Sequence, residues 1–94
     1  MKLEKRFKNS SGDLLVRETQ SCGIVEIMHL YDNNESGCVI GCWTVRKVDG
    51  EDMAEFASIH RRIAETKYDS SDILLDAIKI GQKFADLIID LKTI

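Results

Sequence analysis

Residues 38–52 read CVIGCWTVRKVDGED, and this stretch decides which fold the chain can adopt. Its first part, up to Val48, is rich in β-branched and aromatic residues, which is typical of a strand. At its end, Asp49 is an N-cap candidate, followed within three residues by acids that suit the first turn of a helix. We therefore expect the chain to change from strands to helices at Asp49.

Three further segments upstream have the character of strands, namely residues 2–8, 13–19 and 24–31. Polar clusters at residues 9–12, 20–23 and 32–37 separate them and predict turns. Because short loops can join only antiparallel neighbours, we expect an antiparallel meander of three or four strands. The side chains expected to share the face that receives the helices are Val25, Ile27, Val39, Trp43 and Val45.

Downstream, the hydrophobic period changes to that of a helix. Met53, Phe56 and Ile63 recur at helical spacing, which predicts a first helix from Asp49 to about Lys67. A second helix is expected from about Asp69 to Lys92. The predicted fold class is α+β: a single domain over residues 1–94, with a β-meander in 1–48 and two helices in 49–94 packed on one face.

The second predicted helix is apolar over a wide arc, wider than contact with one sheet requires. Gly81 in its middle costs about 1 kcal/mol relative to alanine, so we interpret it as a close approach of another backbone. A homodimer and a monomer wrapped by its own elements are equally compatible with this pattern. The candidates for an oligomer interface are Ile80, Gly81, Phe84, Ile88 and Leu91.

Charge is distributed unevenly along the 94 residues, whose net charge is −3. Residues 1–19 hold five bases and three acids, whereas residues 49–90 hold ten acids and five bases. The net charge argues against a protein built around nonspecific phosphate contacts. The start of the chain lacks the apolar core of a signal peptide, no long apolar run suits a membrane span, and three cysteines suit reduced thiols. We therefore expect a cytoplasmic protein.

The residues that bear chemistry form no recognised motif. Cys22, His29, Cys38 and Cys42 fall in one stretch, but Cys38 and Cys42 would lie about 13 Å apart on one strand face, too far to share a metal ion. A cysteine paired with His29 or His60 has no surrounding nucleophile signature. We therefore predict no catalytic residue, no metal and no cofactor.

The favoured hypothesis is a small protein-protein interaction module that inhibits or regulates a larger enzyme or complex, and a phage-type inhibitor of a host defence complex is its most specific form. Electrostatic complementarity would present acids to a basic groove, while arginines could anchor an acidic partner. The candidate partner-binding residues are Glu51, Asp52, Glu55, Arg61, Arg62, Asp69 and Asp72.

Two alternatives belong to other classes of function. A single-stranded nucleic-acid binder would use a basic first strand with exposed aromatic rings. Its candidate residues are Lys5, Arg6, Phe7 and Tyr31. A small thiol or hydrolytic enzyme would instead contain a rapidly reacting cysteine.

Overall fold

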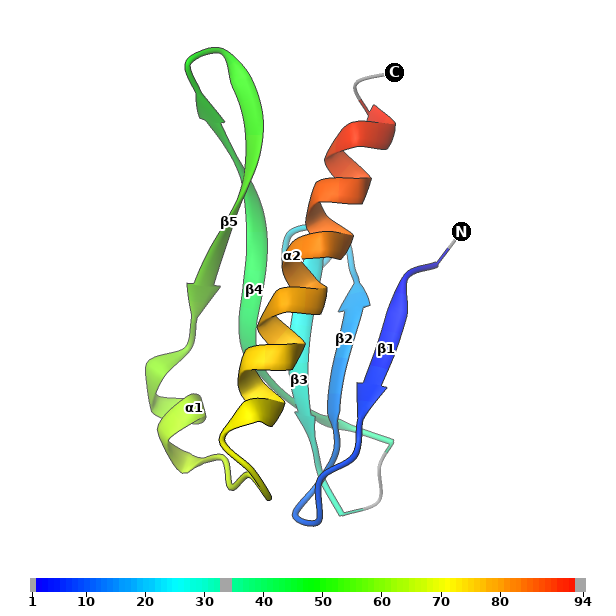
Figure 1. The fold of residues 1–94 in the computed structure, drawn as a ribbon, viewed down its shortest axis with the longest axis vertical. Helices are drawn as coiled ribbons and strands as arrows, with labels where there is room; N and C mark the ends of the chain where they lie inside the picture. Colours follow the sequence, from blue (N-terminus) through cyan, green and yellow to red (C-terminus); the bar gives the residue numbers. More distant parts are fainter. Residues whose placement is uncertain (1, 33–34, 93–94) are drawn as a thin grey trace.

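The computed structural model describes residues 2–32 and 35–92, so part of the predicted loop at 32–37 lies outside the described residues. Five strands come first: β1 (Glu4–Phe7), β2 (Leu14–Glu18), β3 (Val25–Leu30), β4 (Gly37–Val48) and β5 (Glu51–Ser58). Two helices follow, α1 (His60–Glu65) and α2 (Asp72–Lys92). Each strand pairs antiparallel with the next in the chain (Figure 1). The α+β prediction of an antiparallel sheet followed by two helices is confirmed, although the sheet has five strands instead of three or four.

The helix predicted to begin at Asp49 is wrong, because β5 and the short α1 occupy its place. Asp49 and Gly50 have φ angles of 51° and 82°, and Val48 pairs with Glu51 across them. Two consecutive positive φ angles define a type I′ hairpin turn, for which Asp-Gly is a preferred sequence. The dipeptide that resembled a helix start therefore turns the chain into a fifth strand.

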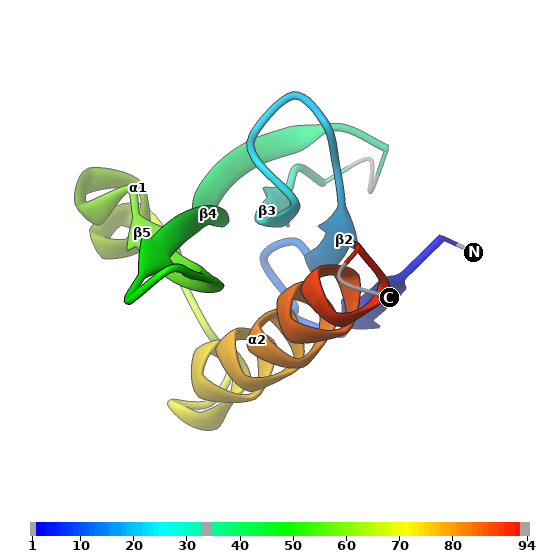
Figure 2. The ribbon, with the colours of Figure 1, turned by 90° about the horizontal axis from the view of Figure 1, so that it is seen from above.

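Helix α2 crosses one face of the sheet and contacts all five strands, and the sheet curves around it (Figure 2). The shorter α1 contacts β4 (Figure 1). Neither helix, among the residues that the structure describes, is long and apolar enough to cross a membrane.

Trp43 is the centre of the core beneath α2. Its ring is fully buried, lies 4.6 Å from the ring of Phe56, and donates a hydrogen bond from Nε1 to Oε1 of Gln82 at 2.9 Å. A Cβ on Gly81 would lie only 2.1 Å from the Trp43 ring. The close approach inferred at Gly81 is therefore real, but its partner is a side chain of the same sheet and not a second backbone.

Most of the predicted inner face is found where expected. Val25 pairs with Trp43, and both are fully buried beneath α2. Val39 departs from the prediction because a bulge at Ile40 shifts the register, so that Val39 pairs with Met28, which alternation places on the opposite face. An insertion of one residue reverses the side on which every earlier side chain of β4 lies.

Candidate functional site

Strands β4 and β5 extend past the rest of the sheet as a two-stranded arm beside the C-terminal half of α2 (Figure 1). A groove of about 450 Å³ lies between this arm and the helix. We call it the arm groove. Its lining residues are Asp52, Met53 and Ala54 from β5 and Gln82, Asp86, Ile89 and Asp90 from α2. At the tip of the arm, the groove continues along Lys47, Gly50 and Glu51.

Simple periodicities place these side chains in the groove. Pairing of Trp43 with Phe56 fixes which face of β5 is turned toward α2, so alternation brings Ala54 and Asp52 to the same side. On α2, Asp86 and Asp90 are one helical turn apart and share a face. Ile89 is buried between the two elements and forms an apolar floor with Ala54.

The arm groove carries an excess of negative charge. Among the residues that the structure describes, the acids that line it are Glu51, Asp52, Asp86 and Asp90, and the base is Lys47. Lys47 Nζ lies 2.8 Å from Asp52 Oδ1, and Asp86 accepts a hydrogen bond of 3.0 Å from Gln82 Nε2. Since Gln82 also binds Trp43, the position of Asp86 is coupled to the core.

Exposed apolar side chains flank the groove on the arm. Val45, Val48 and Met53 are 43%, 37% and 51% exposed, although all three lie within strands. A further hollow of about 330 Å³ beside Val48 and Met53 is bordered by Arg46 and Glu55, an ion pair at 3.2 Å. The arm therefore combines apolar contact area with charge, as the surfaces that bind other proteins do.

The structure divides the predicted partner-binding residues into two groups. Glu51, Asp52 and Glu55 lie together on the arm. The other four are distant from the arm groove: Arg61 and Arg62 form ion pairs with Glu65 on α1, and Asp69 and Asp72 lie before and at the start of α2. The predicted set is therefore not one surface.

Sequence reasoning missed Asp86 and Asp90 as members of this site. They form an i, i+4 pair in the sequence, a spacing that capping and solubility explain equally well. With a helix assigned to residues 49–67, no strand was expected to lie beside them. A hairpin turn at Asp49–Gly50 predicts a strand after it, which is β5, but does not predict that this strand lies beside α2.

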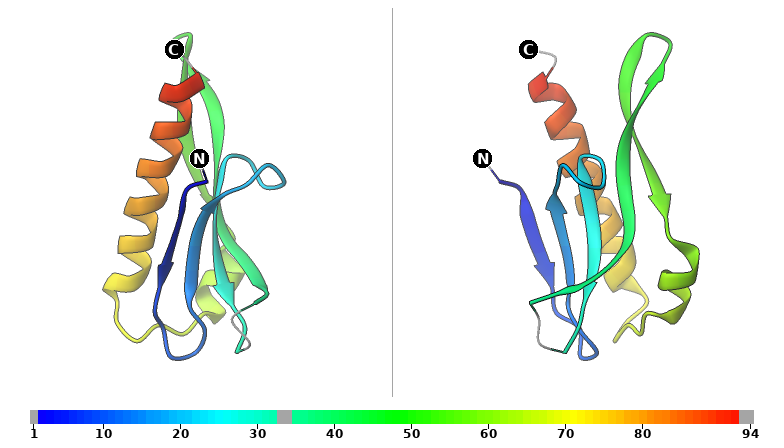
Figure 3. Two further views of the ribbon diagram at one scale, coloured as in Figure 1. Left: turned by 90° about the vertical axis from the view of Figure 1, so that its right-hand side faces the viewer. Right: turned by 180° about the vertical axis from the view of Figure 1, so that it is seen from behind.

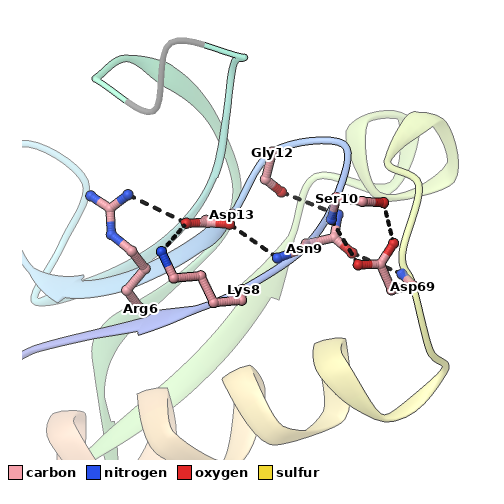
Figure 4. A network of polar contacts seen from close by, with 7 residues as sticks. All are labelled: Arg6, Lys8, Asn9, Ser10, Gly12, Asp13 and Asp69. Atoms are coloured by element: carbon pink, nitrogen blue, oxygen red, sulfur yellow. Dashed lines mark hydrogen bonds and ion pairs between the residues drawn. The ribbon is translucent and has the colours of Figure 1, made fainter.

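Asp69 has a structural role that accounts for its charge (Figure 4). Its carboxylate accepts hydrogen bonds from the backbone N–H of Ser10, at 2.7 Å, and from the Ser10 hydroxyl. The buried Asn9 side chain donates to the carbonyl of Lys67 at 2.7 Å and accepts from the N–H of Asp69 at 2.8 Å. These bonds join the β1–β2 turn to the segment between the helices.

Asp13 belongs to the same network and is almost completely buried. Its Oδ1 accepts a 3.0 Å hydrogen bond from the N–H of Asn9, and its Oδ2 lies 3.5 Å from both Arg6 and Lys8 (Figure 4). The Asn9 hydrogen bond, followed by the charge of Lys8 and the bond from Arg6, lowers the pKa of Asp13 although burial opposes this. The carboxylate therefore stabilises the turn in its ionised form.

The basic first strand does not form a platform with the aromatic residues proposed for nucleic-acid binding. Alternation places Arg6 on the face of β1 opposite Lys5 and Phe7. Phe7 packs against the core with Lys5 Nζ 6.0 Å from its ring centre. Tyr31 lies beyond the end of β3, where its hydroxyl is 2.6 Å from Cys38 Sγ.

His29 and Cys38 lie on one face of the sheet and Cys42 lies on the other. His29 and Cys38 are cross-strand partners that, with Tyr31 and Arg62, line a small cavity of about 190 Å³, and the Cys38 hydrogen bond raises the pKa of Tyr31. Cys42 instead pairs with Glu26 on the other face. The expectation that Cys38 and Cys42 share a face is wrong because of the bulge at Ile40. Within residues 2–32 and 35–92, no three such side chains converge as metal ligands would.

Most of the candidate oligomer interface packs against the protein's own core. Gly81 is enclosed by Trp43, and Ile80, Phe84 and Ile88 pack against the core beneath α2. Leu91 is exposed, as are Leu75 and Leu87 elsewhere on the helix. A homodimer stays a prediction.

No family model matches this chain, and comparison with curated proteins and with solved structures gave no match.

Proposed function

We propose that this protein is a small interaction module that binds a basic, partly apolar segment of another protein in the arm groove. Binding would inhibit or regulate the enzyme or complex to which that segment belongs. A phage-type inhibitor of a host defence complex is the most specific form of this proposal, with a basic segment of that complex as its target.

The observation that supports the proposal is the combination of four acids with an apolar floor in one groove. Opposite charge accelerates encounter and selects the partner, whereas affinity depends on apolar groups buried at the centre of the contact. The apolar groups in the groove are Ile89 and Ala54, which form its floor, and the exposed Met53. The same negative charge disfavours a nucleic-acid backbone at this site.

Charge-matched variants test the proposal. The groove variant carries Asp52→Asn, Asp86→Asn and Asp90→Asn. The control variant carries Glu4→Gln, Asp72→Asn and Asp76→Asn, which remove equal charge from exposed positions outside the groove lining. The probe is a fluorescent peptide of alternating lysine and leucine, and its anisotropy is measured at low and high salt.

We expect the wild type and the control to bind the peptide with an affinity that falls with salt, and the groove variant to bind at least about tenfold more weakly. A peptide of alternating glutamate and leucine should not bind. Equal affinity of the groove variant and the control would contradict the proposal. Pull-downs from host lysate with nuclease, using the same three proteins, then identify the natural partner.

A further inference from the structure

The turn between β2 and β3, residues 19–24, folds back against β4 on the face opposite α2 (Figure 3). Ile24 donates its N–H to the carbonyl of Trp43 at 3.1 Å, which fixes the end of the turn. A Cβ on Gly23 would lie 2.5 Å from the same carbonyl and 3.1 Å from Cγ2 of Thr44. Cys22, the preceding residue, is therefore held beside the part of β4 that carries Cys42.

Cys42 points away from α2, because its register partner Glu26 lies on the face opposite that of Val25 and Ile27. Both thiols are half-buried. Burial raises the pKa of Cys42, and the neighbouring Cys22 raises it further. The third cysteine, Cys38, is paired with His29 on the other face.

We propose that Cys22 and Cys42 form a dithiol site that peroxide oxidises reversibly to an intramolecular disulfide. The Cys22 thiolate attacks one peroxide oxygen, the O–O bond breaks, and the leaving oxygen departs as water after protonation. Cys22 is then a sulfenic acid. The Cys42 thiolate attacks this sulfur, the S–O bond breaks, and a second water leaves. Overall, two thiols and one hydrogen peroxide give one disulfide and two waters.

The surroundings assign different roles to the two thiols. Cys22 lies on an exposed turn, bordered by the exposed Ser21 and Gly23, where an oxidant can reach it. Cys42 lies within β4, where burial raises the pKa of its thiol. Cys22 is therefore the attacking thiol and Cys42 the resolving one. The bond would fix the β2–β3 turn to β4, away from the arm groove, so this site is independent of peptide binding.

The test uses the full chain with Cys38→Ser, which leaves Cys22 and Cys42 as its thiols. Folded protein is treated with hydrogen peroxide and its intact mass is measured. It is then denatured without reductant and cleaved after glutamate, since Glu26 and Glu35 lie between the two cysteines. Two matched variants carry a second substitution, Cys22→Ser or Cys42→Ser, and are treated with peroxide and dimedone.

We expect the Cys38→Ser protein to lose the mass of two hydrogen atoms, at a rate independent of protein concentration. The peptides that carry Cys22 and Cys42 should stay linked until dithiothreitol is added. Dimedone should label the variant that retains Cys22 and not the one that retains Cys42. The proposal is overturned if both thiols stay reduced in folded protein at peroxide concentrations that oxidise the chain unfolded in urea. Preferential linkage of either thiol to Cys38 in the wild type would overturn it as well.

Discussion

Gly81 packs so closely against the Trp43 ring that even a single methyl group at this position would overlap the ring. The sequence shows a glycine where a helix would favour alanine. It does not show that Trp43, 38 positions earlier, lies against that glycine. A close approach was therefore predictable from the sequence, but its partner was not, because the contact depends on how the sheet meets the helix.

Gly81→Ala should destabilise the protein despite the better helix propensity of alanine. Propensity would contribute about 1 kcal/mol of stability, but the new methyl group overlaps the Trp43 ring, and overpacking of this kind costs about 1–3 kcal/mol or more. Urea denaturation measures the change. Trp43→Phe in the Gly81→Ala background should recover part of the loss, because the smaller ring makes room. A Gly81→Ala protein more stable than the wild type would contradict the packing described.

Asp13 predicts a dependence of stability on pH. Its folded pKa is lowered, so its contribution is complete above the unfolded value of about 3.9 and is lost as the pH falls through the folded pKa. Asp13→Asn should therefore cost about 1–3 kcal/mol near neutral pH. The difference in the free energy of unfolding between this variant and the wild type should become smaller in acid. Urea denaturation at several pH values measures it, and a gap that widens in acid would contradict the assignment.

At the scale of elements, the sequence predicted β2, β3 and β4 to within about two residues, and α2 almost completely. The segment after Asp49 was wrong because Asp and Gly serve both as helix caps and as turn residues. The spacing of Met53, Phe56 and Ile63 suggested a helix by chance, since the chain changes from β5 to α1 between them. The alternation in β5 was weak because its inward positions include the small Ala54 and Ser58.

Gly50→Ala tests the hairpin turn directly. A Cβ at this position would meet nothing within 4 Å, so the effect reports the backbone alone. Since φ is 82°, alanine should cost about 1 kcal/mol or more, whereas Gly50→Asn should cost less because asparagine tolerates positive φ. Urea denaturation compares the two variants. Equal stability of all three proteins, or helical amide contacts across residues 51–58 by NMR, would contradict the turn.

The arm groove exists only at the scale of the whole molecule. Asp52 and Asp86 are 34 positions apart, and only the docking of α2 beside the arm brings them to one groove. The sequence could predict that residues 49–90 are acidic, but not which acids would meet. It also could not separate the acids of the arm from Asp69, whose bonds to Ser10 lie in another part of the fold.

Asp90 lies in the last turn of α2, where negative charge opposes the helix dipole, and Asp86 and Asp90 repel each other across one turn. Asp86→Asn with Asp90→Asn should therefore raise stability by about 0.5–1 kcal/mol at low salt and by less at high salt. The matched pair, Asp72→Asn with Asp76→Asn, has the same spacing near the helix N-terminus, where acids are favourable, and should not raise it. Thermal denaturation at two salt concentrations compares the pairs.

If both pairs of substitutions shift the melting temperature in the same direction, the effect of the charges does not depend on their position along the helix. The acids of the groove then do not lower stability more than other acids of α2. If only the C-terminal pair stabilises, the protein keeps Asp86 and Asp90 at the expense of its own stability. Residues retained in that way are typical of binding sites, where function and stability compete. If the same stabilised variant also loses affinity for the peptide, the stability that Asp86 and Asp90 remove is linked to binding in the arm groove.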